Sequence, residues 1–253
     1  MYTPVPTSSG LVHLICKYPA VLLVICITMG ATTLYVSPEE QQCNQSFVSF
    51  TFDDGYASTY AVAYPILEQY AYTGTIYPPT DFIDSPGYVT MFQLHDLETN
   101  GWEIGSHGVS HVGLSGLSGE EAAYEILQSK SILLQEGFSI TSFSTPYGED
   151  IAPFIDVIEP NYLAARNAKD RAWILNDIPT MERYDIEATV VTSDTPVEEV
   201  ERAILKAKNN NKWLVLVFHD LNGDGKYTYP ADKFEEIVKF TRDNDFICAS
   251  ELG

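Results

Sequence analysis

Basic residues are scarce in this chain. Its 253 residues include 14 Lys and Arg against 35 Asp and Glu, which gives a formal net charge of −21. A protein that binds nucleic acid needs clustered Lys and Arg to neutralise phosphates, so the composition argues against nucleic acid as a partner. We interpret the acidity as a solvated surface of the kind that maintains solubility at high salt.

Cysteine is also sparse, with four residues in the whole chain. No C-x-x-C spacing occurs, which excludes a zinc site built from cysteines. Cys43 and Cys248 are either joined in a disulfide or are two free thiols, and the sequence leaves both alternatives open.

Charged residues are absent from 18–36, an apolar segment that follows Lys17 and precedes Glu39 and Glu40. About 19 residues at a rise of ~1.5 Å each nearly match the ~30 Å hydrocarbon core of a bilayer. We therefore predict a cytoplasmic tail at 1–17, a transmembrane signal-anchor at 18–36 and a linker at 37–46. A cleaved signal peptide is the alternative, and a buried core helix ranks third. Both of the first two interpretations place residues 47–253 outside the cytoplasm, anchored to the membrane or secreted.

From residue 47 onward, short β-branched or aromatic runs alternate with stretches of helical spacing. The clearest helix is expected from Glu120 to Gly137, with Ser118 and Glu121 forming a capping box before it. A second helix follows Thr195. The expected strands are FVSFTF, TGTIYP, WEIGSH, ITSFSTPYG, NYLAAR, ATVVT and WLVLVFHD. This alternation predicts an α/β fold with parallel strands and crossover helices, in which reactive residues gather at the carboxyl ends of strands.

Three groups of polar residues follow strands of this series: the adjacent acids Asp53 and Asp54, the pair His107 and His111, and His219. If a helical turn begins at His107, the i, i+4 spacing brings both imidazoles to one face, where they can share a metal. Two histidines and one carboxylate suit Zn²⁺ or a similar divalent ion, and the second carboxylate is then free to accept a proton from a water that the metal activates. His219 is a candidate general acid. The alternative role for one aspartate is to cap the following helix.

The segments TFDDG, H-x-x-x-H after EIGS, TPYG and LVFHDL occur in an order that resembles the polysaccharide deacetylases of carbohydrate esterase family 4, including the nodulation-type chitooligosaccharide deacetylases. The resemblance covers about four fifths of the chain, from Phe47 to the C-terminus. It implies a distorted, incomplete (β/α) barrel and a hydrolase that removes N-acetyl or O-acetyl groups from a polysaccharide. Zinc is the implied metal, with cobalt, nickel or manganese as alternatives, and we expect a monomer.

The resemblance also implies a role for each matching residue. Asp53 is the catalytic base and His219 the catalytic acid. Asp54, His107 and His111 bind the metal. In the TPYG segment, Pro146 precedes Tyr147, whose backbone N–H stabilises the oxyanion. Trp173 either lines the acetyl pocket, as a tryptophan does in many relatives, or packs in the core.

One residue departs from the family pattern. Relatives carry an arginine just before the proline of the third motif, where it pairs with the base, but Ser144 and Thr145 stand there in this chain. Arg166 is a candidate substitute, although we expect it to be an ordinary surface arginine. The missing arginine motivates one alternative function, a catalytically impaired carbohydrate-binding protein. The other alternative is an amidohydrolase of a small non-sugar amide.

A last motif opens like a calcium loop, with the pattern D-x-N-x-D-G from Asp220 to Gly225. Its twelfth position is Ala231 and not the bidentate glutamate of an EF-hand, so we predict a polar loop beside the active site, with weak calcium binding as the alternative.

Overall fold

The computed structural model describes residues 46–178, 182–244 and 246–248. The tail at 1–17, the apolar segment at 18–36, the linker up to residue 45 and Cys43 lie outside the described residues. The anchor therefore stays a prediction, and the two alternatives for Cys43 and Cys248 stay open. Among the residues that are described, no helix is long and apolar enough to cross a membrane.

Strands and helices alternate along the chain, as the sequence predicts. The strands are β1 (Phe47–Asp53), β2 (Thr75–Tyr77), β3 (Glu103–Ile104), β4 (Ser142–Ser144), β5 (Ala164–Arg166), β6 (Lys169–Asp170), β7 (Thr189–Val190), β8 (Trp213–Phe218), β9 (Asp220–Leu221), β10 (Thr228–Tyr229) and β11 (Ile247–Cys248). The α-helices are α1 (Tyr64–Gln69), α2 (Met91–Thr99), α3 (Gly119–Gln135), α4 (Ile155–Ile158), α5 (Val197–Asn210) and α6 (Ala231–Asp243).

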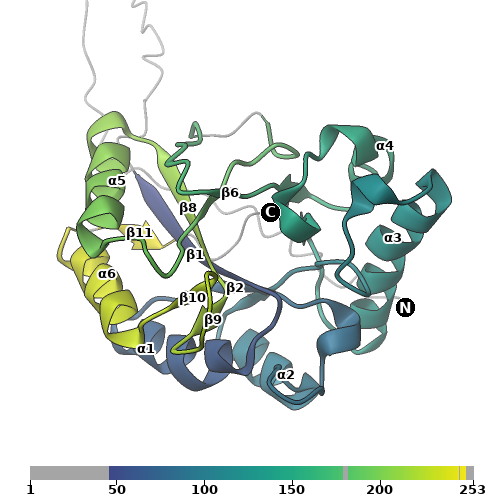
Figure 1. Ribbon diagram of the computed structural model, residues 1–253, viewed down its shortest axis with the longest axis horizontal. Helices are drawn as coiled ribbons and strands as arrows, with labels where there is room; N and C mark the ends of the chain where they lie inside the picture. The colour runs from purple at the N-terminus through teal and green to yellow at the C-terminus, as the bar shows by residue number, and fades with distance from the viewer. Residues whose placement is uncertain (1–45, 179–181, 245, 249–253) are drawn as a thin grey trace, which may run out of the picture. The chain divides into compact units, whose positions relative to one another are not determined.

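The ladders between these strands are parallel. The main sheet has the order β3-β2-β1-β8-β7-β6, with β11 beside the start of β1, and β4 pairs with β5 in a separate ladder. Single bridges, Ser106 to Phe143 and Arg166 to Ile186, connect the β4–β5 pair to its neighbours on both sides. The strands therefore follow one another around an irregular barrel whose ladder is interrupted, and helices lie around the central strands β1 and β8 (Figure 1).

The side chains of β1 alternate between two environments, as expected for a strand covered on both faces. Phe50 and Phe52 belong to the main apolar core, where both rings pack against Phe234 of α6. Thr51 and Asp53 lie on the opposite side, which is the interior of the barrel. This alternation directs Asp53, the last residue of β1, inward at the carboxyl end of the barrel.

The two helices with the strongest sequence signals form where they are expected. Ser118 accepts a hydrogen bond from the backbone N–H of Glu121, whose side chain returns one to Ser118, so the predicted capping box is present at the start of α3. Helix α5 has Glu198 and Glu199 in its first turn and Lys208 in its last, an arrangement that suits the helix dipole.

Candidate active site

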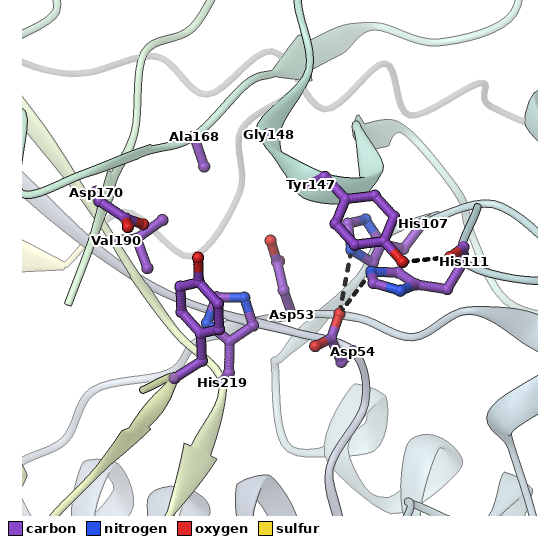
Figure 2. A pocket seen from close by; sticks show the side chains of 11 residues that line it. Asp53, Asp54, His107, His111, Tyr147, Gly148, Ala168, Asp170, Val190 and His219 are labelled. Atoms are coloured by element: carbon purple, nitrogen blue, oxygen red, sulfur yellow. Dashed lines mark hydrogen bonds and ion pairs between the residues drawn. The ribbon is translucent and has the colours of Figure 1, made fainter. Parts of the chain in front are cut away.

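The polar residues that follow β1, β3, β4 and β8 meet at one end of the barrel. They surround a cavity of about 350 Å³ lined by Asp53, Asp54, His107, His111, Tyr147, Gly148, Ala168, Asp170, Val190, His219 and Tyr227. Figure 2 shows Asp53 and Asp54 in the middle, with His107, His111 and Tyr147 on one side and His219 on the other. The predicted gathering of Asp53, Asp54, His107, His111 and His219 at strand ends is confirmed.

Asp54, His107 and His111 form a set of ligand atoms that could hold a metal ion. Their donor atoms lie within 4.8 Å of one another, and no other group of three or more His, Cys, Asp and Glu residues in the described part of the chain does so. The Oδ1 atom of Asp54 lies 3.5 Å from Nε2 of His107 and 3.0 Å from Nε2 of His111. Burial would raise the pKa of Asp54, but the two adjacent histidines hold that pKa well below its ordinary value.

The tautomer of His107 tests whether these residues fit a cation. Its Nδ1 lies 2.8 Å from the backbone carbonyl of Ser144, which can only accept, so Nδ1–H is the donor. In the neutral ring, Nε2 then presents a lone pair toward the carboxylate of Asp54. Two acceptors that face each other need a proton or a cation between them, and a backbone carbonyl behind the ring is the usual support of a metal-binding histidine. The set of two imidazoles and one carboxylate fits zinc or a similar divalent ion.

The two histidines do not converge through a helical turn, so that part of the prediction is wrong. Gly108 and His111 have left-handed backbone angles, with φ of 77° and 56°, which a helix cannot accommodate. The backbone N–H groups of Val109 and Ser110 donate to Oε2 of Glu125 at 2.7 and 2.9 Å, and not to carbonyls of a preceding turn. The hydroxyl of Ser110 donates to Oε1 at 2.7 Å. The buried carboxylate of Glu125 in α3 therefore holds the loop that carries the pair.

Asp53 has partners on both carboxylate oxygens. The guanidinium of Arg166, at the end of β5, donates to Oδ1, and the hydroxyl of Ser144 donates to Oδ2 at 3.3 Å. Burial would raise the pKa of Asp53, but the adjacent Arg166 charge, followed by His107 and His219, holds that pKa below its ordinary value. Asp53 is therefore a carboxylate at neutral pH, ready to accept a proton.

The expectation that Arg166 is an ordinary surface residue is wrong. Its side chain is fully buried, and it forms the ion pair with Asp53 from inside the barrel. Ser144 and Arg166 are neighbours in the β4–β5 ladder, so the arginine that the third motif lacks is supplied by the next strand at the same level.

His219 directly follows β8 and faces the cavity from the side opposite the histidine pair (Figure 2). Burial lowers its pKa below the ordinary value of 6.5, and this effect exceeds the opposing influence of Asp53 and Asp54. Its Nδ1 has no hydrogen-bond partner among the described residues. The ring lies against that of Tyr227, with centroids 5.1 Å apart.

Tyr147 lines the cavity, whereas Pro146 and Trp173 do not. The ring of Tyr147 covers that of His111 at a centroid distance of 4.7 Å, and its hydroxyl donates to the carbonyl of His111 at 3.2 Å. Pro146 is buried in the turn before it. Trp173 is directed to α5, where its indole N–H donates to Glu199 at 2.7 Å, so the core-packing alternative describes it better than the acetyl pocket.

Sequence reasoning missed two residues that supply apolar surface to the cavity, Ala168 and Val190, because neither belongs to a recognisable motif.

The helix-cap and calcium alternatives find no support in the geometry. Ser58 occupies the N-cap position of the first helical segment after the aspartate pair. In the predicted polar loop, Asp220 accepts a hydrogen bond from Ser58 at 2.6 Å, and Asn222 accepts one from the backbone of Ala231 at 2.8 Å. These oxygens serve the local backbone and the neighbouring loop, as the polar-loop interpretation expects.

Comparison with known proteins agrees with this geometry. The family model described as polysaccharide deacetylase matches residues 40–160, a range that holds both aspartates and both paired histidines. The putative polysaccharide deacetylase YxkH of Bacillus subtilis (strain 168) is 31% identical over 94 residues. Over the matched ranges, the chain is similar to the polysaccharide deacetylase family. The match to YxkH covers 37% of this chain and spans about a third, 34%, of the relative's length.

Two solved structures illustrate the similarity in fold. The Xyl-CE4 domain of a multidomain xylanase from the hindgut metagenome of Trinervitermes trinervoides aligns with a TM-score of 0.59 at 19% identity, covering 82% of this chain and 89% of that one. The D285S mutant of the peptidoglycan deacetylase PdaC from Bacillus subtilis aligns with a TM-score of 0.56 at 20% identity, covering 83% and 90%. The α/β fold of this chain is thus the deacetylase-type fold.

Proposed function

We propose that this chain is a metal-dependent hydrolase that removes N-acetyl groups, or alternatively O-acetyl groups, from a polysaccharide. The observation that carries the proposal is that a paired carboxylate base, a candidate metal triad and a second proton carrier line one cavity. Each of these three parts is needed for metal-assisted amide hydrolysis, and none explains the other two.

Asp54, His107 and His111 would hold the divalent ion, for which zinc is our first assignment. When bound, the ion supplies Lewis-acid polarisation of the acetyl carbonyl and of the attacking water. Asp53 accepts the proton that this water loses, because its partners keep it ionised. The water oxygen bonds to the acetyl carbon, and the backbone N–H of Tyr147 donates to the oxyanion that develops.

His219 completes the reaction from the opposite wall. It donates a proton to the sugar nitrogen while the carbon–nitrogen bond breaks, so that acetate and a free amine leave. The apolar side chains of Ala168 and Val190 are positioned to accommodate the acetyl methyl group. For an O-acetyl substrate the same proton goes to the sugar oxygen.

Polymeric substrates are favoured by the relatives, whose names refer to polysaccharide, xylanase and peptidoglycan. The alternative of an impaired carbohydrate-binding protein was motivated by the missing arginine. Arg166 removes that motivation, because the base has a buried cationic partner. The assay below distinguishes hydrolysis of a small non-sugar amide from hydrolysis of a polymer.

The test is acetate release by the purified full chain, loaded with zinc or cobalt. We expect release from N-acetylglucosamine oligomers, acetylated xylan or cell-wall material, and none after Asp53→Asn. Release from small amides alone would support the amidohydrolase, and binding of a glycan that Asp53→Asn leaves unchanged, without acetate release, would support the binding protein.

The location outside the cytoplasm is a separate part of the proposal, and it rests on the apolar sequence at 18–36. We propose that this segment anchors or exports residues 47–253. Membrane fractionation and protease accessibility in intact cells measure this directly, and a protected, soluble catalytic region would contradict it.

A further inference from the structure

Tyr77 stands beside Asp53 in the barrel interior. The β1–β2 ladder pairs the two residues, and side chains at the same level of a parallel ladder project to the same face. Across the interior, the β4–β5 ladder pairs Ser144 with Arg166 in the same way. Two strand pairs thus bring four side chains together below the cavity, and Tyr77 is the member for which the proposed reaction has no role so far.

The ring of Tyr77 faces the guanidinium of Arg166. The Cζ atom of Arg166 lies 4.5 Å from the ring centroid, and both side chains are fully buried. The guanidinium donates to Asp53 through one nitrogen, Nη2, while Nε and Nη1 have no hydrogen-bond partner among the described residues. A single hydrogen bond leaves the plane of a guanidinium free to turn. The aromatic face restricts that rotation through a desolvated cation–π contact.

The chain also makes room for this ring. Gly105 follows β3, the strand next to β2, and a Cβ at that position would overlap the ring of Tyr77. The ring is therefore placed by the backbone on one side and by Arg166 on the other. Neither Tyr77 nor Arg166 lines the cavity, so we assign neither of them a direct contact with substrate.

We propose that Tyr77 is a positioning residue for the base, which acts by holding the guanidinium of Arg166 in the plane that directs Nη2 at Asp53. This inference rests on the proposed function, because Asp53 is a base only if the site is hydrolytic. We assign the effect to the ring because it faces the guanidinium, whereas the hydroxyl makes no hydrogen bond of normal length and angle among the described residues.

The first experiment compares Tyr77→Phe with Tyr77→Leu in zinc-loaded full-length protein. We expect Phe to keep kcat close to wild type. We expect Leu to lower kcat by up to about 100-fold, the scale of a 1 Å misplacement, while KM and the zinc affinity hardly change. Equal kcat for Leu and wild type, or an equal loss for Phe and Leu, would overturn the proposal. If Tyr77→Leu does not fold, Tyr77→Met replaces it as a flexible side chain that fills irregular space.

The second experiment asks whether Tyr77 acts through Arg166. In a double-mutant cycle, Tyr77→Leu should cost nothing further in kcat once Arg166→Met is present. Losses that multiply would indicate a merely structural ring and would overturn the proposal.

A measurement without turnover separates this inference from the proposed function. If wild type releases no acetate, the proposed function fails, but the same cycle can be followed by denaturant unfolding. We expect the two substitutions to be non-additive by roughly 10- to 30-fold in the unfolding equilibrium constant, as for a buried cation–π pair. Additive effects on unfolding would refute the contact itself.

Discussion

Arg166 in β5 forms a buried ion pair with Asp53 in β1, although the two lie 113 positions apart in the sequence. The pair lies inside the barrel, where the side chains are 0% and 5% exposed. A buried charge without a partner is strongly destabilising, so each member of the pair depends on the other. The ion pair therefore links the stability of the barrel to the ionisation of its proposed base.

Removing the arginine should destabilise the metal-free protein. We expect Arg166→Met to lower the free energy of unfolding at neutral pH by about 3–5 kcal/mol, because the carboxylate of Asp53 is left buried and unpaired. The pKa of Asp53 is below its ordinary value of 3.8 in the folded protein, so the pair contributes stability above that value and loses it as the pH falls. The difference between variant and wild type should accordingly narrow on acidification. Denaturant unfolding with a chelator present measures this.

The control for this prediction is the double variant Asp53→Asn with Arg166→Met. It removes both charges, so we expect it to be more stable than Arg166→Met alone. A single Arg166→Met variant as stable as wild type at neutral pH would show that the ion pair does not compensate a buried charge.

Metal binding should depend on Asp54 and not on Asp53. We expect Asp54→Asn to weaken zinc affinity by more than about 100-fold, the upper end for changes behind the ligands. Asp53→Asn should bind zinc yet release no acetate, because only the proton acceptor is lost. Calorimetric titration with zinc and an acetate assay distinguish the two. His95→Gln serves as a control for the loss of a potential zinc ligand elsewhere in the chain, since His95 stacks on Phe138 and lies outside the cavity.

Glu125 should control metal affinity without touching the metal. Glu125→Ala leaves the N–H groups of Val109 and Ser110 without their acceptor, and we expect zinc affinity to fall by about 10- to 100-fold. Glu125→Gln should bind zinc nearly as wild type does, because its amide oxygen can accept both N–H groups. Glu121→Ala on the same helix removes a capping interaction and should leave zinc affinity unchanged. Equal zinc affinities for Glu125→Ala and Glu121→Ala would contradict a role for Glu125 in holding the loop.

Residue order and periodicity predicted the positions of the main strands and of α3 and α5. Because parallel strands share a carboxyl edge, the sequence also predicted that the polar residues at the strand ends lie together, namely Asp53, Asp54, His107, His111 and His219. What the sequence could not provide was long-range pairing. Arg166 belongs to a three-residue strand, and nothing local indicates that its level in the ladder matches Ser144. The loop between His107 and His111 is shaped by Glu125, 15 residues beyond Ser110, where helical spacing suggested a simpler local cause.

The pH dependence of turnover should report His219. Burial lowers its pKa below 6.5, and a general acid must be protonated to donate, so we expect kcat/KM to fall as the pH rises past that lowered value. Asp53, whose pKa is lowered, sets no limit until the pH is well below its ordinary 3.8. His219→Gln should lose about 10²- to 10⁴-fold in rate and with it the alkaline decline, while zinc affinity stays that of wild type. Initial rates of acetate release across the pH range, measured for both proteins at saturating zinc, decide the matter. An alkaline decline that survives in His219→Gln at the same pH would assign it to another group and remove His219 from the role of acid.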